Sequence, residues 1–211
     1  ATGLDGFRMA MMQRAAETNE SFEITMPSVT AKLVAKLIYE GSDVSFRFGD
    51  GLMIVEDYET AIQASLLSGQ YIDTKRMIFR DSNLSVKANG KDLLQAVRMA
   101  LISAKDNQKG LIVLNFANDD SFTVSARSES SNAVSSVACD KIGGVSVGGK
   151  EKEPQAPEIA FNGEYVEDAL KTALGYGDDV KLLFNTPISP MAVMPMANDS
   201  YYQLVLPVRR L

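Results

Sequence analysis

The strongest constraint on this chain is an internal repeat of one supersecondary unit. In the first copy, apolar residues at helical spacing over 31–38 predict a helix, with Ser28 as its cap and Gly41 at its end. The segments SFRF and LMIV flank a turn at 49–51 and predict a hairpin, and residues 58–67 predict a further strand. With the short strand expected in FEITMP before the helix, the order of elements is β-α-β-β-β.

The same order recurs twice further along the chain. The second copy places a helix in 90–110, between the strand LSVKAN and three later strands. The third begins with the strand EIAFN and a helix at 165–177, and its segment LGYGDDVKLLF aligns without a gap with IYEGSDVSFRF of the first copy. Residues 1–14 predict a strand-like tail that could end a fourth unit. Because repeated units usually bury their faces against one another, we expect an α+β fold with antiparallel sheets and few helices.

The composition narrows the possible chemistry. The chain has no histidine, which excludes Ser-His-Asp and Cys-His catalysis and almost every zinc site. Its single cysteine, Cys139, excludes an internal disulfide and suits a reducing compartment; we find no segment of membrane-spanning length and no signal peptide. The net charge of −6 disfavours nucleic-acid binding by the whole surface but leaves room for a local basic stripe.

Two predicted helices carry such a stripe. Lys91, Arg98 and Lys105 follow one another at nearly two helical turns, so they lie along one side of their helix. Lys32 and Lys36 are neighbours on the first helix. These side chains either form an ordinary solvent-exposed surface or contact nucleic-acid phosphates independently of the base sequence.

Two other sequence features are compatible with nucleotide or metal binding. The segment GVSVGGK at 144–150 has the spacing of a phosphate-binding loop, but Glu151 follows it where a hydroxyl should hold magnesium, so we interpret it as a linker. The acidic pairs Asp119–Asp120 and Asp178–Asp179 could bind a metal ion, which keeps an enzyme as an alternative. Both pairs fall at predicted turns, where Asp is common for backbone reasons.

Four segments, in order along the chain, resemble the bacterial DNA sliding clamp family, the beta subunit of DNA polymerase III. LDGFRMA is similar to the family's Asp-Gly-(His/Tyr/Phe)-Arg-(Leu/Met)-Ala signature, and SGQYIDTKRMI to its Gly-Arg-Phe-Pro-Asp-Tyr-Arg-Arg-Val-Leu segment. IAFNGEYVEDAL resembles the family's Phe-Asn-x-x-Tyr helix start, and YYQLVLPVRRL its C-terminal Tyr-Val-Val-Met-Pro-Met-Arg-Leu. Phe7 stands where histidine is frequent, Leu4 where threonine is frequent, and Arg210 precedes the terminal leucine, so we expect a shifted peptide preference.

The resemblance implies a DNA-clamp fold, with helices on one side of antiparallel sheets. Residues 1–82 then correspond to an incomplete middle domain and 83–211 to the C-terminal domain. Family members are non-catalytic processivity factors of the bacterial cytoplasm that need no cofactor. Two protomers close into a homodimeric ring around duplex DNA, provided that the first domain is present. The alternative is an adaptor of the same fold that binds peptides but does not encircle DNA.

The resemblance also implies two functional surfaces. The first is a hydrophobic pocket that receives a short Gln-x-x-Leu-Phe-like peptide from the replicative polymerase, the clamp loader and repair proteins. Its matching residues are Leu4, Gly6, Phe7, Arg8, Met9, Ile72, Arg76, Met77, Asn162, Tyr165, Ile188, Pro190, Leu204, Val205, Leu206, Pro207, Val208 and Arg209. The second is a DNA-facing surface formed by Lys32, Lys36, Lys91, Arg98 and Lys105. Aliphatic and methionine side chains would give the pocket an adaptable lining that suits several partners.

Overall fold

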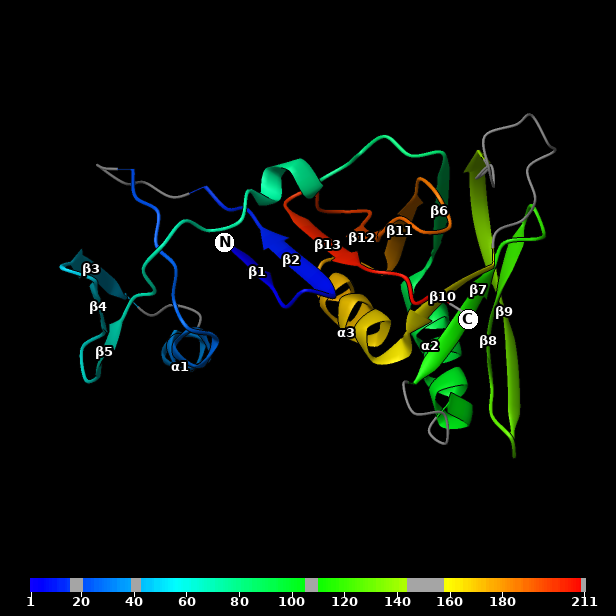
Figure 1. Cartoon of the computed structure of the whole chain (residues 1–211), viewed down its shortest axis with the longest axis horizontal. Helices are drawn as coiled ribbons and strands as arrows, with labels where there is room; N and C mark the ends of the chain where they lie inside the picture. The colour runs from blue at the N-terminus through cyan, green and yellow to red at the C-terminus, as the bar shows by residue number, and fades with distance from the viewer. Residues whose placement is uncertain (16–20, 39–42, 105–109, 144–157, 210–211) are drawn as a thin grey trace. The chain divides into compact units, whose positions relative to one another are not determined.

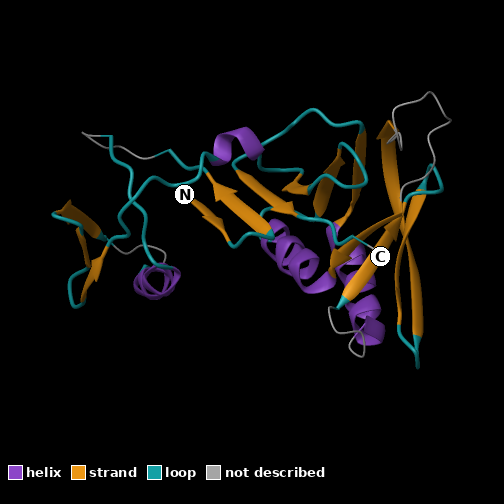
Figure 2. Ribbon diagram, viewed as in Figure 1, coloured by secondary structure: helices purple, strands orange, loops and turns teal. Residues whose placement is uncertain are grey.

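The computed structural model describes residues 1–15, 21–38, 43–104, 110–143 and 158–209. The chain folds as two compact units, whose elements are labelled in Figure 1 and coloured by type in Figure 2. The first unit contains Ala1–Ala15 and Arg76–Leu211, and the second contains Ala16–Lys75. Antiparallel sheets combined with a few helices confirm the α+β class. The proposed boundary at residue 82 concerns the family's domains and stays a prediction.

The first unit is built on a ten-stranded sheet in which every pairing is antiparallel. Its spatial order is β1-β2-β13-β12-β11-β6-β9-β8-β7-β10. The strands are β1 (Thr2–Leu4), β2 (Arg8–Met12), β6 (Leu84–Asn89), β7 (Leu111–Asn115), β8 (Ser121–Arg127), β9 (Asn132–Gly143), β10 (Glu158–Asn162), β11 (Asp179–Phe184), β12 (Met191–Pro195) and β13 (Tyr201–Val205). Strand β2, near the start of the chain, therefore pairs with β13, near its end.

Alternation along these strands divides their apolar side chains between two cores. Leu182 joins the larger core beneath the helices α2 (Gly90–Ala104) and α3 (Gly163–Leu174), whereas its neighbour Leu183 faces the opposite side of the sheet. On that side, the Tyr202 hydroxyl donates to the carbonyl of Phe79 at 3.0 Å and accepts from its N–H at 3.1 Å. The two helices lie together on one side of the sheet, as predicted (Figure 1).

Each of these helices begins at an asparagine cap followed by glycine. The side-chain oxygen of Asn89 accepts hydrogen bonds from two N–H groups in the first turn of α2, at 3.0 and 3.2 Å. Asn162 does the same for α3, at 2.9 and 3.4 Å. Both caps satisfy backbone donors that the helix itself leaves without partners.

The glycines at these helix starts allow a close approach between the repeats. A Cβ atom on Gly163 would lie only 2.7 Å from a methyl carbon of Leu101, near the end of α2. A Cβ atom on Gly90 would lie 2.9 Å from a methyl carbon of Leu174, at the end of α3. The start of each helix thus packs against the end of the other, so the two repeats are arranged reciprocally.

The second unit contains a single described helix and a small sheet. Its elements are α1 (Ser28–Leu37), β3 (Ser45–Gly49), β4 (Leu52–Glu56) and β5 (Ala61–Ser65). The three strands are antiparallel and adjacent in sequence order, as the predicted hairpin and following strand require. Val34 from the helix and Met53 and Val55 from β4 form the centre of its core. The short 3-10 helix η1 (Thr74–Met77) spans the division between the units in the sequence.

Two local predictions about the helix of the second unit and the segment before it were wrong. Ser28 does not cap α1 but is its first residue, because the carbonyl of Pro27 already accepts the N–H of Ala31 at 3.1 Å. The segment FEITMP forms no strand in the structure, although Thr25 accepts a hydrogen bond from the N–H of Leu67 at 2.8 Å.

The strand expected over 58–67 is also shorter than predicted. The Asp57 carboxylate accepts hydrogen bonds from the N–H groups of Glu59 and Thr60, at 2.9 and 2.7 Å, and holds this segment in a turn. Strand β5 therefore begins only at Ala61. Gly41, Lys105, the motif at 144–150 with Glu151, and Arg210 lie outside the described residues.

Candidate functional site

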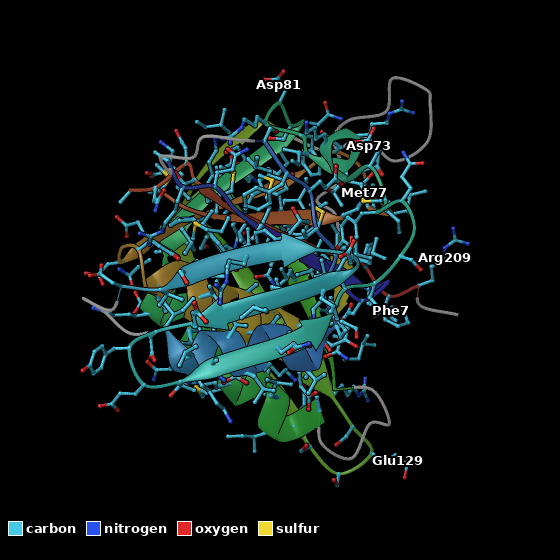
Figure 3. All side chains as sticks on the ribbon, turned by 90° about the vertical axis from the view of Figure 1, so that its left-hand side faces the viewer. Phe7, Asp73, Met77, Asp81, Glu129 and Arg209 are labelled. Atoms are coloured by element: carbon cyan, nitrogen blue, oxygen red, sulfur yellow. The ribbon has the colours of Figure 1, made fainter. Side chains whose placement is uncertain are left out.

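The turn between β1 and β2 presents Phe7 to solvent. Gly6 adopts a φ of 86°, a left-handed conformation that glycine allows without strain. One Asp5 oxygen accepts hydrogen bonds from the N–H groups of Phe7 and Arg8, at 3.1 and 3.0 Å. With its backbone fixed in this way, Phe7 remains 60% exposed. The sequence signal Asp-Gly thus marks a turn that displays an aromatic side chain (Figure 3).

Arg8 is held by two carboxylates and one aromatic ring. Its Nε lies 2.9 Å from Asp5, one terminal nitrogen lies 2.7 Å from Asp168, and the guanidinium carbon is 4.4 Å from the centre of the Tyr165 ring. The hydrogen bond to Asp168 raises the pKa of Arg8 above its usual value. Partial burial raises the pKa of Asp5, but hydrogen bonds from Arg8 and from the backbone outweigh it and leave that pKa lowered.

The carboxyl-terminal segment joins this turn directly. Strand β13 pairs with β2 up to Val205, and the N–H of Leu206 then donates to the carbonyl of Phe7 at 2.9 Å. Two residues later, the N–H of Val208 donates to the carbonyl of Ala160 on β10, at 2.7 Å. The segment therefore crosses from the Phe7 turn to the strand that precedes α3.

Exposed apolar side chains gather along this crossing. The ring centre of Phe7 lies 6.3 Å from that of Tyr165 on α3, and Leu206 is 39% exposed. Ile188, in the turn between β11 and β12, is 70% exposed. Since Met191 pairs with Val205, this turn leads into the strand beside the start of the terminal segment. We call Phe7, Tyr165 and Leu206 the Phe7 surface.

Other residues predicted for the pocket are placed as follows. Met9 and Leu204 are paired across β2 and β13 and are buried in the smaller core, with Leu4 packed against it. Val205 is buried in the larger core. These side chains support the sheet beneath the Phe7 surface, and any part they play in a pocket stays a prediction.

The remaining pocket residues are less enclosed. Asn162 uses its side-chain oxygen to cap α3, immediately before Tyr165. Pro190, Pro207 and Val208 are half-buried, and Arg209 is exposed. Arg76 and Met77 lie in η1, and Met77 is 42% exposed. Ile72, 53% exposed, belongs to the second unit and is described only within it.

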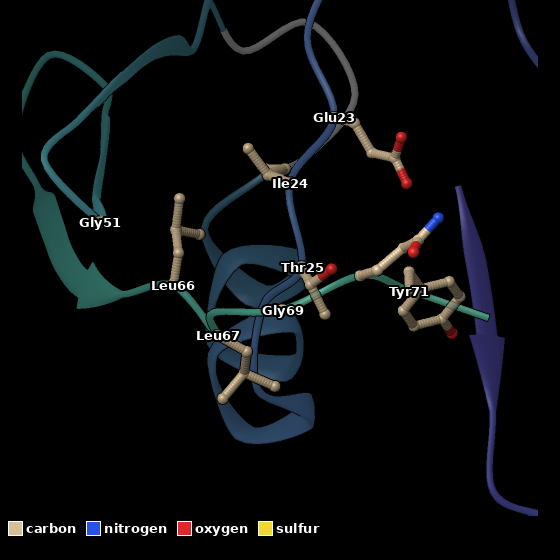
Figure 4. Close-up of a pocket in the computed structure, with 9 residues that line it drawn as sticks. Glu23, Ile24, Thr25, Gly51, Leu66, Leu67, Gly69 and Tyr71 are labelled. Carbon is tan, nitrogen blue, oxygen red and sulfur yellow. The ribbon is translucent and has the colours of Figure 1, made fainter.

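The structure also contains hollows that sequence reasoning did not anticipate. One of about 380 Å³ lies within the second unit and is lined by Glu23, Ile24, Thr25, Gly51, Leu66, Leu67, Gly69, Gln70 and Tyr71 (Figure 4). Another, of about 250 Å³, lies over β7, β8 and β9. Neither is lined by a predicted site residue.

The predicted DNA-facing cations on α2 have acidic partners. Lys91 lies 2.7 Å from Asp178, and Arg98 lies 2.9 Å from Glu167 on α3. The hydrogen bond to Asp178 raises the pKa of Lys91, and hydrogen bonds from Lys171 and Arg98 lower the pKa of Glu167. Lys32 and Lys36 are exposed on α1, in the second unit. Sequence reasoning identified the cations but missed the carboxylates that pair with them.

The acidic pairs considered for metal binding have other contacts. Asp119 lies 3.0 Å from the Lys141 ammonium, and Asp178 bonds to Lys91. Within the described residues, no group of three His, Cys, Asp or Glu side chains is placed to hold a metal ion. The same part of the chain contains no helix that is both long and apolar enough to span a membrane.

Comparison with known proteins links this geometry to one family. Residues 75–209 match the profile of the DNA polymerase III beta subunit, C-terminal domain. The chain is 24% identical over 212 residues to the beta sliding clamp of Bacillus subtilis and 23% identical over 210 residues to that of Staphylococcus aureus. These matches cover 99% of this chain but 53% and 52% of the relatives, so the chain spans about half the length of the curated relatives it matches.

Solved structures show the same fold. The sliding clamp of Bacillus subtilis superposes with a TM-score of 0.85 at 22% identity, over 100% of this chain and 53% of that one. A Pseudomonas aeruginosa clamp bound to griselimycin gives a TM-score of 0.85 at 20% identity, over 99% of this chain and 54% of that one. The predicted DNA-clamp fold is therefore confirmed.

Proposed function

Because the chain belongs to the DNA polymerase III beta subunit family, we propose that it forms a large part of a sliding clamp, a non-catalytic processivity factor. In this role it encircles duplex DNA in the bacterial cytoplasm without reading its sequence. It tethers the replicative polymerase, the clamp loader and repair proteins through a short Gln-x-x-Leu-Phe-like peptide. Residues 1–82 and 83–211 are then the incomplete middle domain and the C-terminal domain.

The observation that carries the peptide-binding role is the junction between Leu206 and Phe7. It joins the turn between β1 and β2 to the segment that follows β13, and together they form one exposed apolar surface next to Tyr165. A leucine and a phenylalanine from a bound peptide would each gain about 2–3 kcal/mol by burial, before ordering costs. The expected affinity is micromolar, which suits partners that must exchange.

The test is binding of a labelled Gln-Leu-Ser-Leu-Phe peptide to the unaltered chain and to Phe7→Ala. We expect the substitution to weaken binding about tenfold, because Phe7 offers apolar area for the peptide to cover. Phe22→Ala is a matched control: Phe22 is 57% exposed and also lies near one aromatic ring, that of Phe48 at 4.7 Å between centres. Equal effects of both substitutions would place the peptide elsewhere.

The DNA-binding role depends on Lys32, Lys36, Lys91, Arg98 and Lys105. Their contacts with phosphates should be weak, since a clamp that encircles DNA needs only enough attraction to slide. Ring closure by two protomers requires the family's first domain. The test is loading of the full-length protein on nicked circular and linear DNA, because only an encircling clamp is lost from linear ends.

A second candidate is a peptide-binding adaptor that does not encircle DNA. The pairing of Lys91 with Asp178 and of Arg98 with Glu167 favours it, since both pairs reduce the positive charge that α2 offers to phosphates. Equal retention on circular and linear DNA, together with normal peptide binding, would support the adaptor.

A further inference from the structure

Beside the Phe7 surface lies a cation, Arg8, which already pairs with two carboxylates of the chain. Arg8 donates to Asp5 at 2.9 Å and to Asp168 at 2.7 Å, and its guanidinium carbon lies over the Tyr165 ring. Arginine binds carboxylates through a planar fork of N–H groups, and here two of its nitrogens are already used within the chain. The ring of Tyr165, 4.4 Å from the guanidinium carbon, adds a cation–π contact.

The two carboxylates have different effects on the turn. Asp5 also bonds to the backbone N–H groups of Phe7 and Arg8, so it shapes the turn itself. The Asp168 carboxylate contacts Arg8 from another element, α3, and its side chain is 54% exposed. Removing the charge of Asp168 would therefore release one side of the guanidinium while leaving the turn in place.

We infer that Asp168 is a specificity-determining residue of the Phe7 surface: it occupies the Arg8 guanidinium and thereby disfavours peptides with a carboxylate next to their apolar anchors. This inference rests on the proposed peptide-binding function and names the peptide class. An acidic peptide side chain would have to compete with Asp168 for Arg8 and would meet the carboxylates of Asp168 and Asp5. Glu164, exposed one helical turn before Asp168, adds a further negative charge to the same side of α3.

The test compares three labelled peptides, Gln-Leu-x-Leu-Phe with x as Ser, Asp or Lys. The unaltered chain should bind the Ser and Lys peptides more tightly than the Asp peptide. In Asp168→Asn, the affinity of the Asp peptide relative to the Ser peptide should rise about threefold, the size expected for an exposed ion pair. The change should shrink in about 1 M salt, where exposed charges are screened. Asp168→Glu, which keeps the carboxylate, should retain the original order.

The matched control is Asp178→Asn, which removes another exposed carboxylate bonded at 2.7 Å to a cation. It should leave the ratio of Asp to Ser peptide affinities unchanged. If Asp168→Asn weakens all three peptides equally, Asp168 supports the structure only and the inference is overturned. If the unaltered chain binds none of the peptides, the proposed function fails and the inference fails with it.

Discussion

The repeated unit occurs in two settings in this molecule, although the copy in the second unit lacks its first strand, and the settings differ in how the helix is supported. In the first unit, α2 and α3 pack against each other, and each has an asparagine cap and a glycine at its start. In the second unit, α1 starts at Ser28, and Pro27 before it supplies no side-chain cap. The helices of the paired repeats are therefore capped and closely packed on each other, whereas α1, as described, contributes Val34 to the small core of its own unit.

Residues at equivalent positions of the repeats differ in how exposed they are. The gap-free alignment of the repeats, extended back into the helices, places Leu33 of α1 at the position of Ala169 in α3. Ala169 is fully buried, whereas Leu33 is 48% exposed. In the following strands, Phe46 is 43% exposed where its counterpart Leu182 is fully buried. Position in the repeat alone does not determine burial; the neighbouring repeat does.

The largest expected effect is a difference in local stability between the two units. Amide hydrogens of α1 should exchange at least about 100-fold faster than the slowest ones of α2, because the second unit has a much smaller buried core to hold its helix. Hydrogen exchange followed residue by residue, and corrected for intrinsic rates, measures this. Similar protection in both helices would show that the second unit opens only when the first does. It would contradict the expected difference in local stability.

The next effect concerns the close approach of the paired helices. Gly163→Ala should lower the free energy of unfolding of the first unit by about 2 kcal/mol, because its Cβ would crowd Leu101 and Ile112 at 2.7 and 2.8 Å. Urea unfolding monitored on the first unit measures the change. Gly3→Ala is the control, since no atom lies within 4 Å of a Cβ there. A Gly163→Ala variant as stable as Gly3→Ala would mean that the helices can separate at little cost.

Much of this architecture could be predicted from the sequence, because the apolar periodicity of each repeat is local. The segment DVKLLF was predicted as the strand after the third helix, and the structure forms β11 there, with Leu182 and Leu183 in different cores. The family resemblance placed residues from both ends of the chain in one pocket, but the pairing of β2 with β13 was not predicted. Contacts between distant residues were missed: Arg8 and Asp168 are 160 positions apart, and Arg98 and Glu167 are 69 apart. No local pattern encodes such pairs, since they depend on how the elements pack.

In the candidate site, too, local features could be predicted from the sequence, whereas features that depend on packing could not. The exposure of Phe7 follows from a local Asp-Gly turn, which the sequence indicates. By contrast, no local pattern shows that Met9 and Leu204 are buried in the smaller core, and their part in a pocket stays a prediction. Which face of a strand is covered depends on the segment packed over it, here the one containing Ile78 and Phe79.

A smaller effect is expected at the helix caps. Asn162→Ala should lower the free energy of unfolding of the first unit by about 1 kcal/mol, because two N–H groups of α3 would lose their acceptor. Asn118→Ala is the control, since among the described residues its side chain makes one long hydrogen bond, to Ser121 at 3.4 Å. Thermal unfolding of both variants measures the difference. Equal stability of the two would remove capping as a reason for the contrast with α1.

The smallest expected effect concerns the salt bridges of Glu167 on α3, one of which joins it to Arg98 on α2. Hydrogen bonds from Lys171 and Arg98 lower the pKa of Glu167 below its usual 4.5. A carboxylate with a lowered pKa in the folded chain contributes stability above its unfolded pKa, and this is lost as the pH falls through the folded value. The first unit should therefore lose about 0.5 kcal/mol from this group below about pH 4.5.

Glu167→Gln should remove that part of the pH dependence and lower stability at neutral pH by the same small amount. Glu129→Gln, in the exposed turn between β8 and β9, is the control for losing any surface carboxylate. Unfolding free energies measured from pH 7 down to about pH 3 for all three chains compare the two sites. If both variants follow the same curve, the bridge from α2 to α3 adds nothing to stability. The contrast between paired and single repeats would then rest on packing and capping alone.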